Sequence, residues 1–356
     1  MCTLSDLGFS SFFEAQVADR PIEPACTARI AAEHRNEYDI LTVNGAAKAS
    51  LPGRGFAESD HDSLPKVGDW VVLQAPGSHT SIERVLTRRT ALTRGAAGRA
   101  SSQQILAANV DVVFIVAGLD ASFNPNRIER YLSLVWAGGA TPTVVLNKAD
   151  LADNPLEVQL EAEGHCPGVE VIIASSETSE GIDRIRAMLE AGITGAFIGP
   201  SGVGKSTLIN ALTGEAQMDT GEVRAADKKG RHTTAHRQLI LLPDRGLVID
   251  TPGLRELQLT ESEGIASVFP EIESLAEQCR FRDCRHQSEP GCAVKQAVKE
   301  GSVDRERYEH YLKLQHDAAS FELRQNERLR RQTERSRGKL TREGQMIRRM
   351  KGNRSR

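Results

Sequence analysis

Short apolar segments separated by turn residues characterise the first part of the chain. The clearest strands between residues 26 and 89 are Thr27–Ala32, Tyr38–Val43 and Trp70–Leu73, with turn pairs such as Asn44-Gly45 between them. Roughly five short strands in a segment of this length fit a small barrel of the oligonucleotide-binding type. Another small β-barrel fits the same pattern nearly as well.

From Val110 onward the pattern changes to an alternation of strands and helices, which predicts a mostly parallel sheet covered by helices on both faces. The expected strands are Val110–Val116, Thr143–Leu146, Val169–Ala174, Ala196–Ile198, Gln238–Leu242 and Gly246–Ile249. The expected helices are Asn126–Trp136, Ile182–Leu189 and Lys205–Leu212. Beyond about Thr260 the chain is predicted to be helical.

The fold class is therefore multidomain α/β, and five segments are expected: a loose leader at 1–24, the barrel at 25–92, the α/β domain at 105–260, a helical domain at 261–325 and a basic tail at 326–356. Hydrophobic residues make up 39% of the 356 residues and charged residues 26%, which is typical of a globular protein. No apolar run approaches the roughly 18 residues of a membrane span, and the first residues lack a secretory signal. We expect a cytoplasmic protein.

The net charge of −3 conceals an asymmetry, because residues 321–356 contain 13 Lys/Arg and 4 Asp/Glu. This segment is at +9 and the remainder at −12. A basic tail favours contact with nucleic acid, although a charged terminal helix is often only solvated. The last dozen residues contain no acid and are the better candidate for RNA contact.

A phosphate-binding loop follows the predicted strand Ala196–Ile198. Its residues are Gly199, Pro200, Ser201, Gly202, Val203, Gly204, Lys205 and Ser206, followed by Thr207, and they match G-x-x-x-x-G-K-[S/T] at every fixed position. Glycines let main-chain N–H groups surround a phosphate, and the next helix presents its positive end. Lys205 is expected on the β- and γ-phosphates, and the Ser206 hydroxyl on Mg²⁺.

A guanine-reading motif, Asn147-Lys148-Ala149-Asp150, ends the predicted strand Thr143–Leu146. The Asp150 carboxylate can accept hydrogen bonds from N1–H and the exocyclic amine of guanine, while the Lys148 stem stacks on the ring. Ser175 and Ser176, after another strand, are candidates for the loop that supports the guanine O6. The bound nucleotide is therefore expected to be GTP or GDP.

Two further segments complete the expected Mg²⁺ and γ-phosphate contacts. Asp250 ends a strand and would act behind the Mg²⁺ ligands, while the Gly253 N–H would contact the γ-phosphate. Thr233 and Thr234 belong to a switch segment, and Thr234 is the expected Mg²⁺ ligand. The guanine motif precedes the phosphate loop by about 50 residues, so the order of motifs is circularly permuted relative to Ras-like GTPases. The permuted order offers a mechanical link from the Asp250 switch to the C-terminal domain.

Three cysteines and one histidine form a compact cluster: Cys279, Cys284, His286 and Cys292. This is the ligand set of a closed, structural zinc site, and it predicts one Zn²⁺ per chain. Buried free cysteines beside an unrelated histidine are the alternative. Arginines within the cluster could meet an RNA backbone.

The order N-K-A-D, G-P-S-G-V-G-K-S, G-R-H-T-T, D-T-P-G and C-x4-C-x-H-x5-C resembles the RsgA (YjeQ) family of bacterial GTPases. Pro65–Val71 and Asn126–Leu132 are similar to that family too. The resemblance implies an oligonucleotide-binding barrel, a permuted GTPase domain and a zinc-knuckle helical domain. It also implies late maturation of the small (30S) ribosomal subunit, with GTP hydrolysed to GDP and phosphate, and rRNA contacted by the barrel, zinc domain and tail. We expect a monomer with no membrane contact.

The residue that positions the attacking water is open, because Leu254 stands where Ras-like enzymes have a glutamine. His232 is the catalytic candidate, beside Thr234 and Lys205, and His236 is a second; both could equally be solvated loop histidines. Activation by K⁺ is not supported, because Gly202 replaces the asparagine used by some permuted GTPases.

Three alternatives compete with this interpretation. A permuted GTPase of the large subunit generally lacks both the barrel and the knuckle. An RNA-binding assembly chaperone would use the nucleotide pocket only as a switch. Leu254 in place of the usual glutamine is compatible with this alternative. An ATPase is disfavoured by Asp150.

Overall fold

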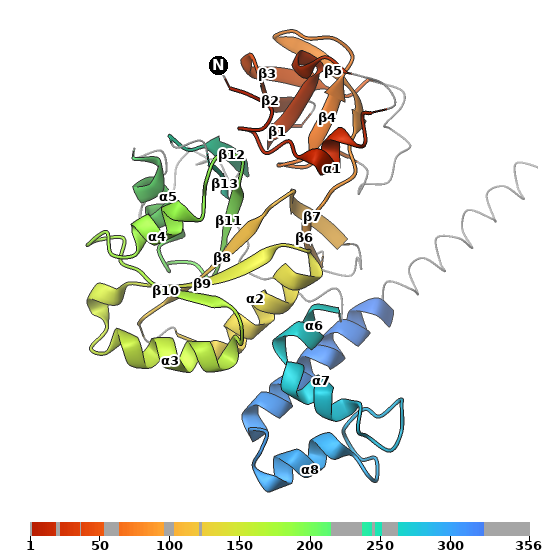
Figure 1. Ribbon diagram of the computed structural model, residues 1–356, viewed down its shortest axis with the longest axis vertical. Coiled ribbons are helices and arrows are strands. Elements are labelled where there is room, and N and C mark those ends of the chain that lie inside the picture. Colours follow the sequence, from red (N-terminus) through yellow and green to blue (C-terminus); the bar gives the residue numbers. More distant parts are fainter. Residues whose placement is uncertain are drawn as a thin grey trace, which may run out of the picture.

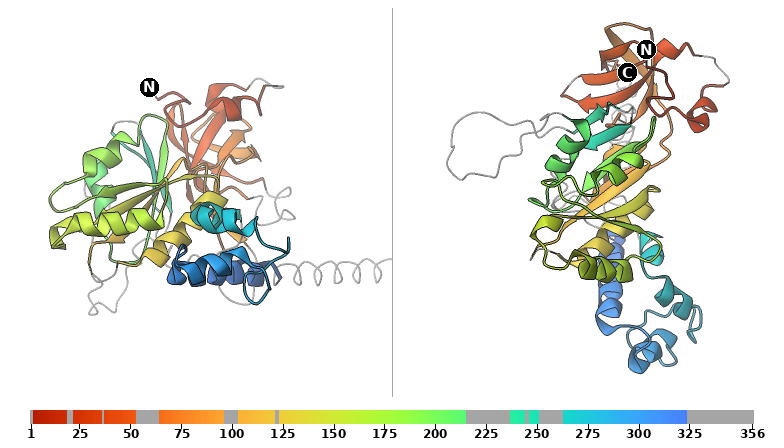
Figure 2. Two further views of the ribbon diagram at one scale, coloured as in Figure 1. Left: turned by 60° about the horizontal axis from the view of Figure 1, so that its bottom comes forward. Right: turned by 60° about the vertical axis from the view of Figure 1, so that its left-hand side comes forward.

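A computed structural model describes residues 2–18, 22–35, 37–52, 64–95, 103–120, 123–214, 237–243, 246–250 and 263–323. Three parts follow one another along the long axis: a barrel at the top of Figure 1, an α/β layer in the middle and a helical part at the bottom. The right-hand view of Figure 2 shows the same succession. Within the described ranges, no helix combines the length and the apolar character that crossing a bilayer requires.

The barrel consists of β1 (Thr27–Glu33), β2 (Tyr38–Thr42), β3 (Gly45–Ser50), β4 (Trp70–Leu73) and β5 (His79–Val85). The strands follow the order β1-β2-β3-β5-β4, and β4 pairs back onto β1 to close the sheet. Only the β3–β5 pairing is parallel within this barrel. The predicted five-stranded barrel is thus confirmed, with side chains such as Ile30, Ile40 and Ile82 filling its interior at 0% exposure.

The first residues are packed, so the expectation of a loose leader is wrong for this segment. Helix α1 (Ser11–Glu14) and the preceding turn bury Leu7 and Phe13 to 1% exposure. The Phe9 ring meets the Trp70 ring edge-on at a centroid distance of 4.8 Å. The leader was not predicted to pack because its aromatic residues follow neither helical nor strand periodicity.

A buried arginine joins this leader to the barrel and to the α/β layer. Arg29 on β1 donates hydrogen bonds to the main-chain oxygens of Leu7 (2.5 Å), Gly68 (3.2 Å) and Asn109 (2.9 Å). Its guanidinium also lies 5.6 Å from the Trp70 ring centroid. Burial lowers the pKa of Arg29 to about 9, so its charge depends on these acceptors for stabilisation.

The α/β sheet has the strand order β10-β9-β8-β11-β13-β12. Its strands are β8 (Val112–Gly118), β9 (Thr141–Asn147), β10 (Glu170–Ile173), β11 (Thr194–Ile198), β12 (Gln238–Leu241) and β13 (Leu247–Asp250). All neighbours are parallel except β12 with β13, which confirms the mostly parallel sheet. β12 continues into the barrel through one pairing, Ala32 with Gln238.

Helices cover both faces of this sheet because successive β8 residues point to opposite sides. Val113 and Ile115 share a core with Ile128 and Leu132 of α2 (Pro125–Ala137), and α3 (Pro155–His165) covers the same side. Phe114 and Val116 face α4 (Ile182–Ala187) and α5 (Lys205–Thr213) instead. β8 is therefore buried on both faces, as its nearly continuous apolar sequence requires.

Helix α3 and the hairpin that follows the barrel were also not predicted from the sequence. Helix α3 buries Ala162 but exposes Leu156 and Leu160, so its apolar residues do not fall on one face. A separate hairpin of β6 (Ala91–Gly95) and β7 (Gln103–Ala108) joins the barrel to the sheet across the expected boundary region. The five segment boundaries themselves stay a prediction.

The helical part contains α6 (Glu263–Val268), α7 (Pro270–Ala276), α8 (Ala293–Glu300) and a final helix over residues 305–323. It packs on α2 through very close backbone contact. A Cβ at Gly264 would lie only 1.8 Å from the Ser133 main-chain oxygen, so α6 tolerates no side chain at this position.

The α2–helical-part contact is centred on one buried carboxylate. Glu129 on α2 is 0% exposed and accepts hydrogen bonds from His165 Nδ1 (2.7 Å), from Arg307 and from His310. Burial by itself raises the pKa of Glu129, but the two histidine hydrogen bonds and the Arg307 charge outweigh it and leave that pKa below its ordinary value. Arg307 also donates to the Val268 main-chain oxygen at 2.7 Å. Glu129 therefore connects three helices, α2, α3 and the helix over 305–323.

Replacement of Glu129 by alanine is expected to lower the free energy of unfolding by about 3 kcal/mol, because Arg307 and His310 lose a buried carboxylate. The loss lies at the lower end of the range for a broken buried pair, since Arg307 keeps its contact with the partly exposed Glu271. Urea denaturation followed by circular dichroism measures this change. The matched control is Glu309→Ala on the helix of Arg307, where the carboxylate is 65% exposed and pairs with the exposed Arg305. Equal stability of both variants would contradict the role assigned to Glu129.

Candidate functional site

The carboxyl ends of neighbouring parallel strands meet at one edge of the sheet. Ile198 at the end of β11 pairs with Ile115 of β8, and Leu146 near the end of β9 pairs with Ile173 of β10. The residues that follow these strands therefore lie together, although they come from three distant parts of the chain. They are the predicted phosphate loop, guanine motif and Ser175-Ser176 pair, and such an edge is where parallel α/β sheets bind ligands.

The phosphate loop has the backbone conformation that its sequence predicts. Gly199, Gly202 and Gly204 have positive φ values of 146°, 81° and 94°, and α5 begins directly afterwards at Lys205. The Lys205 ammonium donates to the main-chain oxygens of Gly199 (2.8 Å) and Pro200 (2.7 Å). The amine therefore lies over the loop, next to where the N-terminus of α5 would meet a phosphate.

Asn147 joins the guanine motif to the phosphate loop and to the serine pair. Its amide donates to the Val203 main-chain oxygen at 2.7 Å, and its side-chain oxygen accepts from Ser176 N–H (3.3 Å) and Oγ (3.2 Å). A Cβ at Gly204 would lie 2.3 Å from the Asn147 nitrogen, so this close approach requires glycine. The asparagine is 1% exposed and thus acts as an internal brace.

The Asp150 carboxylate is exposed but fixed in orientation by Ser175. The Ser175 hydroxyl donates to Asp150 at 2.5 Å and accepts from the Thr178 N–H at 3.2 Å. One Asp150 oxygen is therefore engaged by the protein, while the residue itself remains exposed. Ser175 and Ser176 were predicted at this site, and the structure brings both to it.

Asp120 is a site residue that the sequence analysis missed. It follows β8, and its carboxylate pairs with the Lys148 ammonium at 2.8 Å. Lys148 itself has a left-handed backbone with φ of 67°, which turns the chain out of β9 into the next short helix. Asp120 could have been predicted from the sequence, because it is an acid directly after a buried strand that ends at the same sheet edge.

The predicted Mg²⁺ and switch residues are only partly described. Asp250 ends β13 next to β11, and Ser206 and Thr207 form the first turn of α5. His232, Thr233, Thr234 and Gly253, with Leu254 and His236, lie outside the described residues. Their roles stay predictions, as do those of the phosphate-loop and guanine-motif residues.

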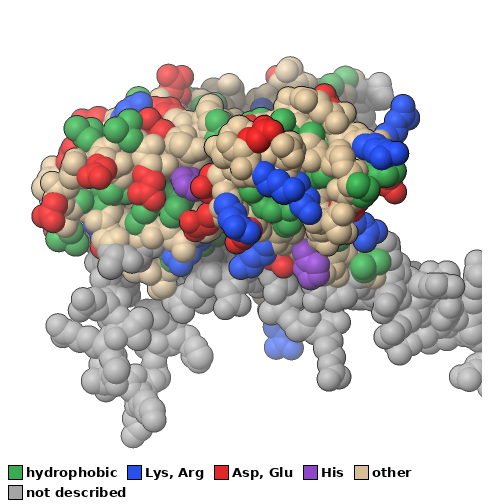
Figure 3. Space-filling view, turned by 90° about the horizontal axis from the view of Figure 1, so that it is seen from below, with side chains coloured by type: hydrophobic (Ala, Val, Ile, Leu, Met, Phe, Trp, Pro, Cys, Tyr) green, Lys and Arg blue, Asp and Glu red, His purple; other side chains and the backbone are tan. Residues whose placement is uncertain are grey.

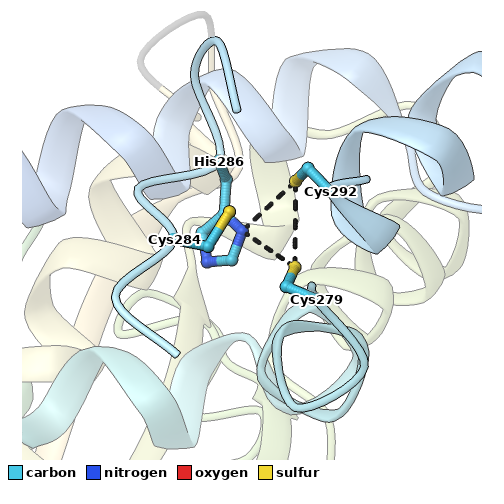
Figure 4. Close-up of side chains that lie close together, drawn as sticks. All are labelled: Cys279, Cys284, His286 and Cys292. Carbon is cyan, nitrogen blue, oxygen red and sulfur yellow. Dashed lines mark hydrogen bonds between the residues drawn. The ribbon is translucent and has the colours of Figure 1, made fainter. Parts of the chain in front are cut away.

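The Cys/His cluster comes together at the start of α8, and its four donor atoms lie within 4.8 Å of one another (Figure 4). Sγ of Cys279 is 3.9 Å from Sγ of Cys292, and His286 Nδ1 is 3.6 Å and 3.5 Å from these two sulfurs. A tetrahedral zinc ion with Zn–S of about 2.3 Å and Zn–N of about 2.0 Å requires edges of about 3.8 and 3.5 Å. The donor set therefore fits Zn²⁺, as predicted.

Neighbouring groups orient the zinc ligands. Cys292 is the N-cap of α8 and accepts a hydrogen bond from Lys295 N–H at 3.4 Å. His286 is 4% exposed with φ of 59°, and the Tyr308 hydroxyl donates to its main-chain oxygen. Protein contacts thus hold the Cys292 sulfur and the His286 backbone in place, as is usual around a structural metal site.

The chain matches the family model "RsgA GTPase" over residues 85–260. A relative from Opitutus terrae named "Small ribosomal subunit biogenesis GTPase RsgA" is 43% identical, and the match covers 97% of this chain and 98% of that protein. A relative of the same name from Xanthomonas campestris is 45% identical over 83% of this chain and 82% of its own.

Two solved structures have a similar fold. The crystal structure of YjeQ from Thermotoga maritima superposes with a TM-score of 0.62 at 29% identity, covering 82% of this chain and 98% of that one. YloQ, described as a circularly permuted GTPase, superposes with a TM-score of 0.59 at 27% identity, covering 83% and 95%. The permuted motif order predicted from the sequence is confirmed by this likeness.

The zinc site predicts that Cys292→Ser lowers the zinc content from about one per chain and reduces the thermal stability of the helical part. Metal analysis after gel filtration and a thermal melt measure both effects. Cys26→Ser is the control, because Cys26 lies in the barrel far from the cluster. Unchanged zinc content in Cys292→Ser would argue against this ligand set.

The guanine motif predicts that Asp150→Asn reduces the preference for GTP over ATP by roughly 100-fold, because an amide cannot accept both guanine N–H groups. Competition between nucleotides in an equilibrium binding assay gives the preference. The control is Asp153→Asn, an exposed carboxylate three residues further on. If both variants discriminate like the parent protein, Asp150 does not read the base.

Proposed function

Because the chain belongs to the RsgA GTPase family, we propose that it is a GTP hydrolase that acts in the biogenesis of the small ribosomal subunit. One observation supports this proposal above all others. The guanine motif, the phosphate loop and the Ser175-Ser176 pair converge at one sheet edge through the Asn147 hydrogen bonds. Full-length relatives carry the small-subunit name, which extends the proposal to the ribosome.

The reaction is the attack of water on the γ-phosphorus of GTP, with release of GDP and phosphate. Asp150 and Lys148 bind the base, and the loop from Gly199 to Ser206 surrounds the phosphates. Lys205 neutralises charge on the β- and γ-phosphates. Ser206 and Thr234 would bind Mg²⁺ directly, and Asp250 would act through its water ligands. When bound, Mg²⁺ would supply positive charge that offsets the charge of the phosphates.

We propose His232 as the residue that orients the attacking water, with the Gly253 N–H on the γ-phosphate. The Leu254 side chain has no polar atom with which to orient water, so this role passes to another side chain or to the ribosome. Thr233 is proposed as a further nucleotide contact in the same switch. His236 is the second candidate for water orientation.

Ribosomal RNA is the proposed partner of the zinc domain, the barrel and the basic tail. Figure 3, which views the molecule from below, shows Lys and Arg gathered on the central and right-hand part of this face. The zinc domain contributes exposed Arg280, Arg282 and Arg285 around the cluster. The tail from about 326 to 356 lies outside the described residues, and its proposed role rests on charge alone. We further propose a cytoplasmic monomer.

A second function remains open on one observation. Leu254 in place of the usual glutamine is compatible with an RNA-binding assembly chaperone that uses GTP binding as a switch and hydrolyses it slowly. The two functions differ in whether the ribosome accelerates hydrolysis.

Hydrolysis of GTP by the purified protein is expected to rise on the order of 10-fold or more when small ribosomal subunits are added. Phosphate release at saturating GTP measures this, with large subunits and ATP as controls. The Lys205→Ala variant should lose both rates, while His232→Ala should keep GTP binding and lose stimulated hydrolysis. Stimulation by neither subunit would remove the ribosomal part of the proposal and leave the nucleotide site intact. Nucleotide-dependent subunit binding with no acceleration would support the switch function.

A further inference from the structure

The α3 surface, which we define as Leu151, Leu156 and Leu160 with the acids around them, is unusually apolar for an exposed helix. The three leucines are 66%, 65% and 70% exposed, and they come from ten consecutive residues. Among the other described large hydrophobic side chains, Leu323 alone reaches a similar exposure (67%), and it lies on a different helix. Three such leucines in one place suggest a contact surface.

The leucines are not needed to attach α3 to the sheet. The inner side of the helix packs through Ala162, which is fully buried, and through Val158. Leu156 and Leu160 lie one helical turn apart on the opposite side, so they form a row that points into solvent. Their exposure is therefore a property of this outer row and not a by-product of core packing.

A row of acids runs beside the leucines. Glu157 and Glu161 are also one turn apart, and Asp153 and Glu163 extend the negative charge to both ends of the helix. Among the residues that the structure describes, none of these four carboxylates forms an ion pair with a Lys, Arg or His side chain. Figure 3 shows hydrophobic and acidic side chains side by side on its left part, which corresponds to the position of α3 in Figure 1.

We propose that the α3 surface docks a basic protein segment of the small ribosomal subunit, one that presents apolar side chains flanked by Lys or Arg. The unpaired acids repel phosphates, so RNA does not fit this surface, whereas the leucines and acids together match a basic amphipathic protein. This inference rests on the proposed function. On this inference α3 contacts a protein of the small subunit, while the arginines around the zinc cluster contact rRNA.

The position of Leu151 gives this contact a relation to the nucleotide. It ends the short helix Ala149–Leu151 and directly follows Asp150, whose carboxylate is fixed by Ser175. A partner that covers Leu151 therefore packs next to the guanine-reading carboxylate. Docking on the α3 surface and nucleotide binding share one loop.

The test compares the parent protein with the double variant Leu156→Gln/Leu160→Gln, because glutamine keeps the helix propensity while removing the apolar row. Binding is measured on intact small subunits in the presence of a non-hydrolysable GTP analogue. The expected result is a Kd raised roughly 10- to 100-fold, with basal GTP hydrolysis unchanged. Glu157→Gln/Glu161→Gln should also weaken binding and reduce its dependence on salt. The matched control is Leu323→Gln, a leucine of 67% exposure on the final helix.

A second arm separates protein from RNA and from self-association. Binding to protein-free small-subunit rRNA should be the same for the parent and the double variant, and a photoreactive side chain at position 160 should label a protein of the subunit. An unchanged Kd on intact subunits, an equal loss on rRNA or cross-linking to RNA would overturn the inference. So would a parent dimer in sedimentation equilibrium that the double variant abolishes. If the parent itself does not bind intact subunits, the proposed function fails first, and the α3 partner falls with it.

Discussion

The parallel pairing of β8 with both β9 and β11 is the constraint on which the site depends. It brings the ends of β9 and β11 to one edge, where β10 adds the serine pair by its own pairing with β9. The Asn147 amide then joins the guanine motif to the phosphate loop at 2.7 Å. These contacts depend on which strands are neighbours and not on the order in which the chain visits them. That independence is the physical reason why a permuted chain builds the same kind of site.

Two buried charged groups set how the three parts of the molecule meet. Arg29 connects the leader, the barrel and the α/β layer through main-chain acceptors, and Glu129 connects α2 with α3 and the final helix. Each would be costly without its partners, so the arrangement that satisfies them is strongly preferred over a rotated one. The β1–β12 pairing adds a direct hydrogen-bonded path between the barrel and the strand next to Asp250.

The surface divides into regions of different chemistry. The helical part carries arginines around the Cys/His cluster, whose geometry fits Zn²⁺. The α3 surface instead carries exposed leucines and acids without an ion-pair partner among the described residues. A particle made of RNA and basic protein can bind both surfaces, RNA at the basic one and protein at the acidic one. Two surfaces of unlike charge on one protein then fix its orientation on such a particle. Glu129 connects the two regions physically, because it binds His165 at the end of α3 and His310 on the final helix.

The sequence by itself determined the features whose chemistry is local. The phosphate loop, the N-K-x-D motif and the four zinc ligands each require particular residues at short fixed spacings, and strand periodicity placed the five-stranded barrel and the parallel sheet. Only the tertiary structure decided the packing of Phe9 on Trp70, the Asp120–Lys148 pair, the partners of Glu129 and the exposed leucines of α3. These depend on residues far apart in the chain, or on which face of a helix the sheet leaves uncovered. Neither is encoded in local spacing, because burial and side-chain pairing depend on which segments contact one another in the folded chain.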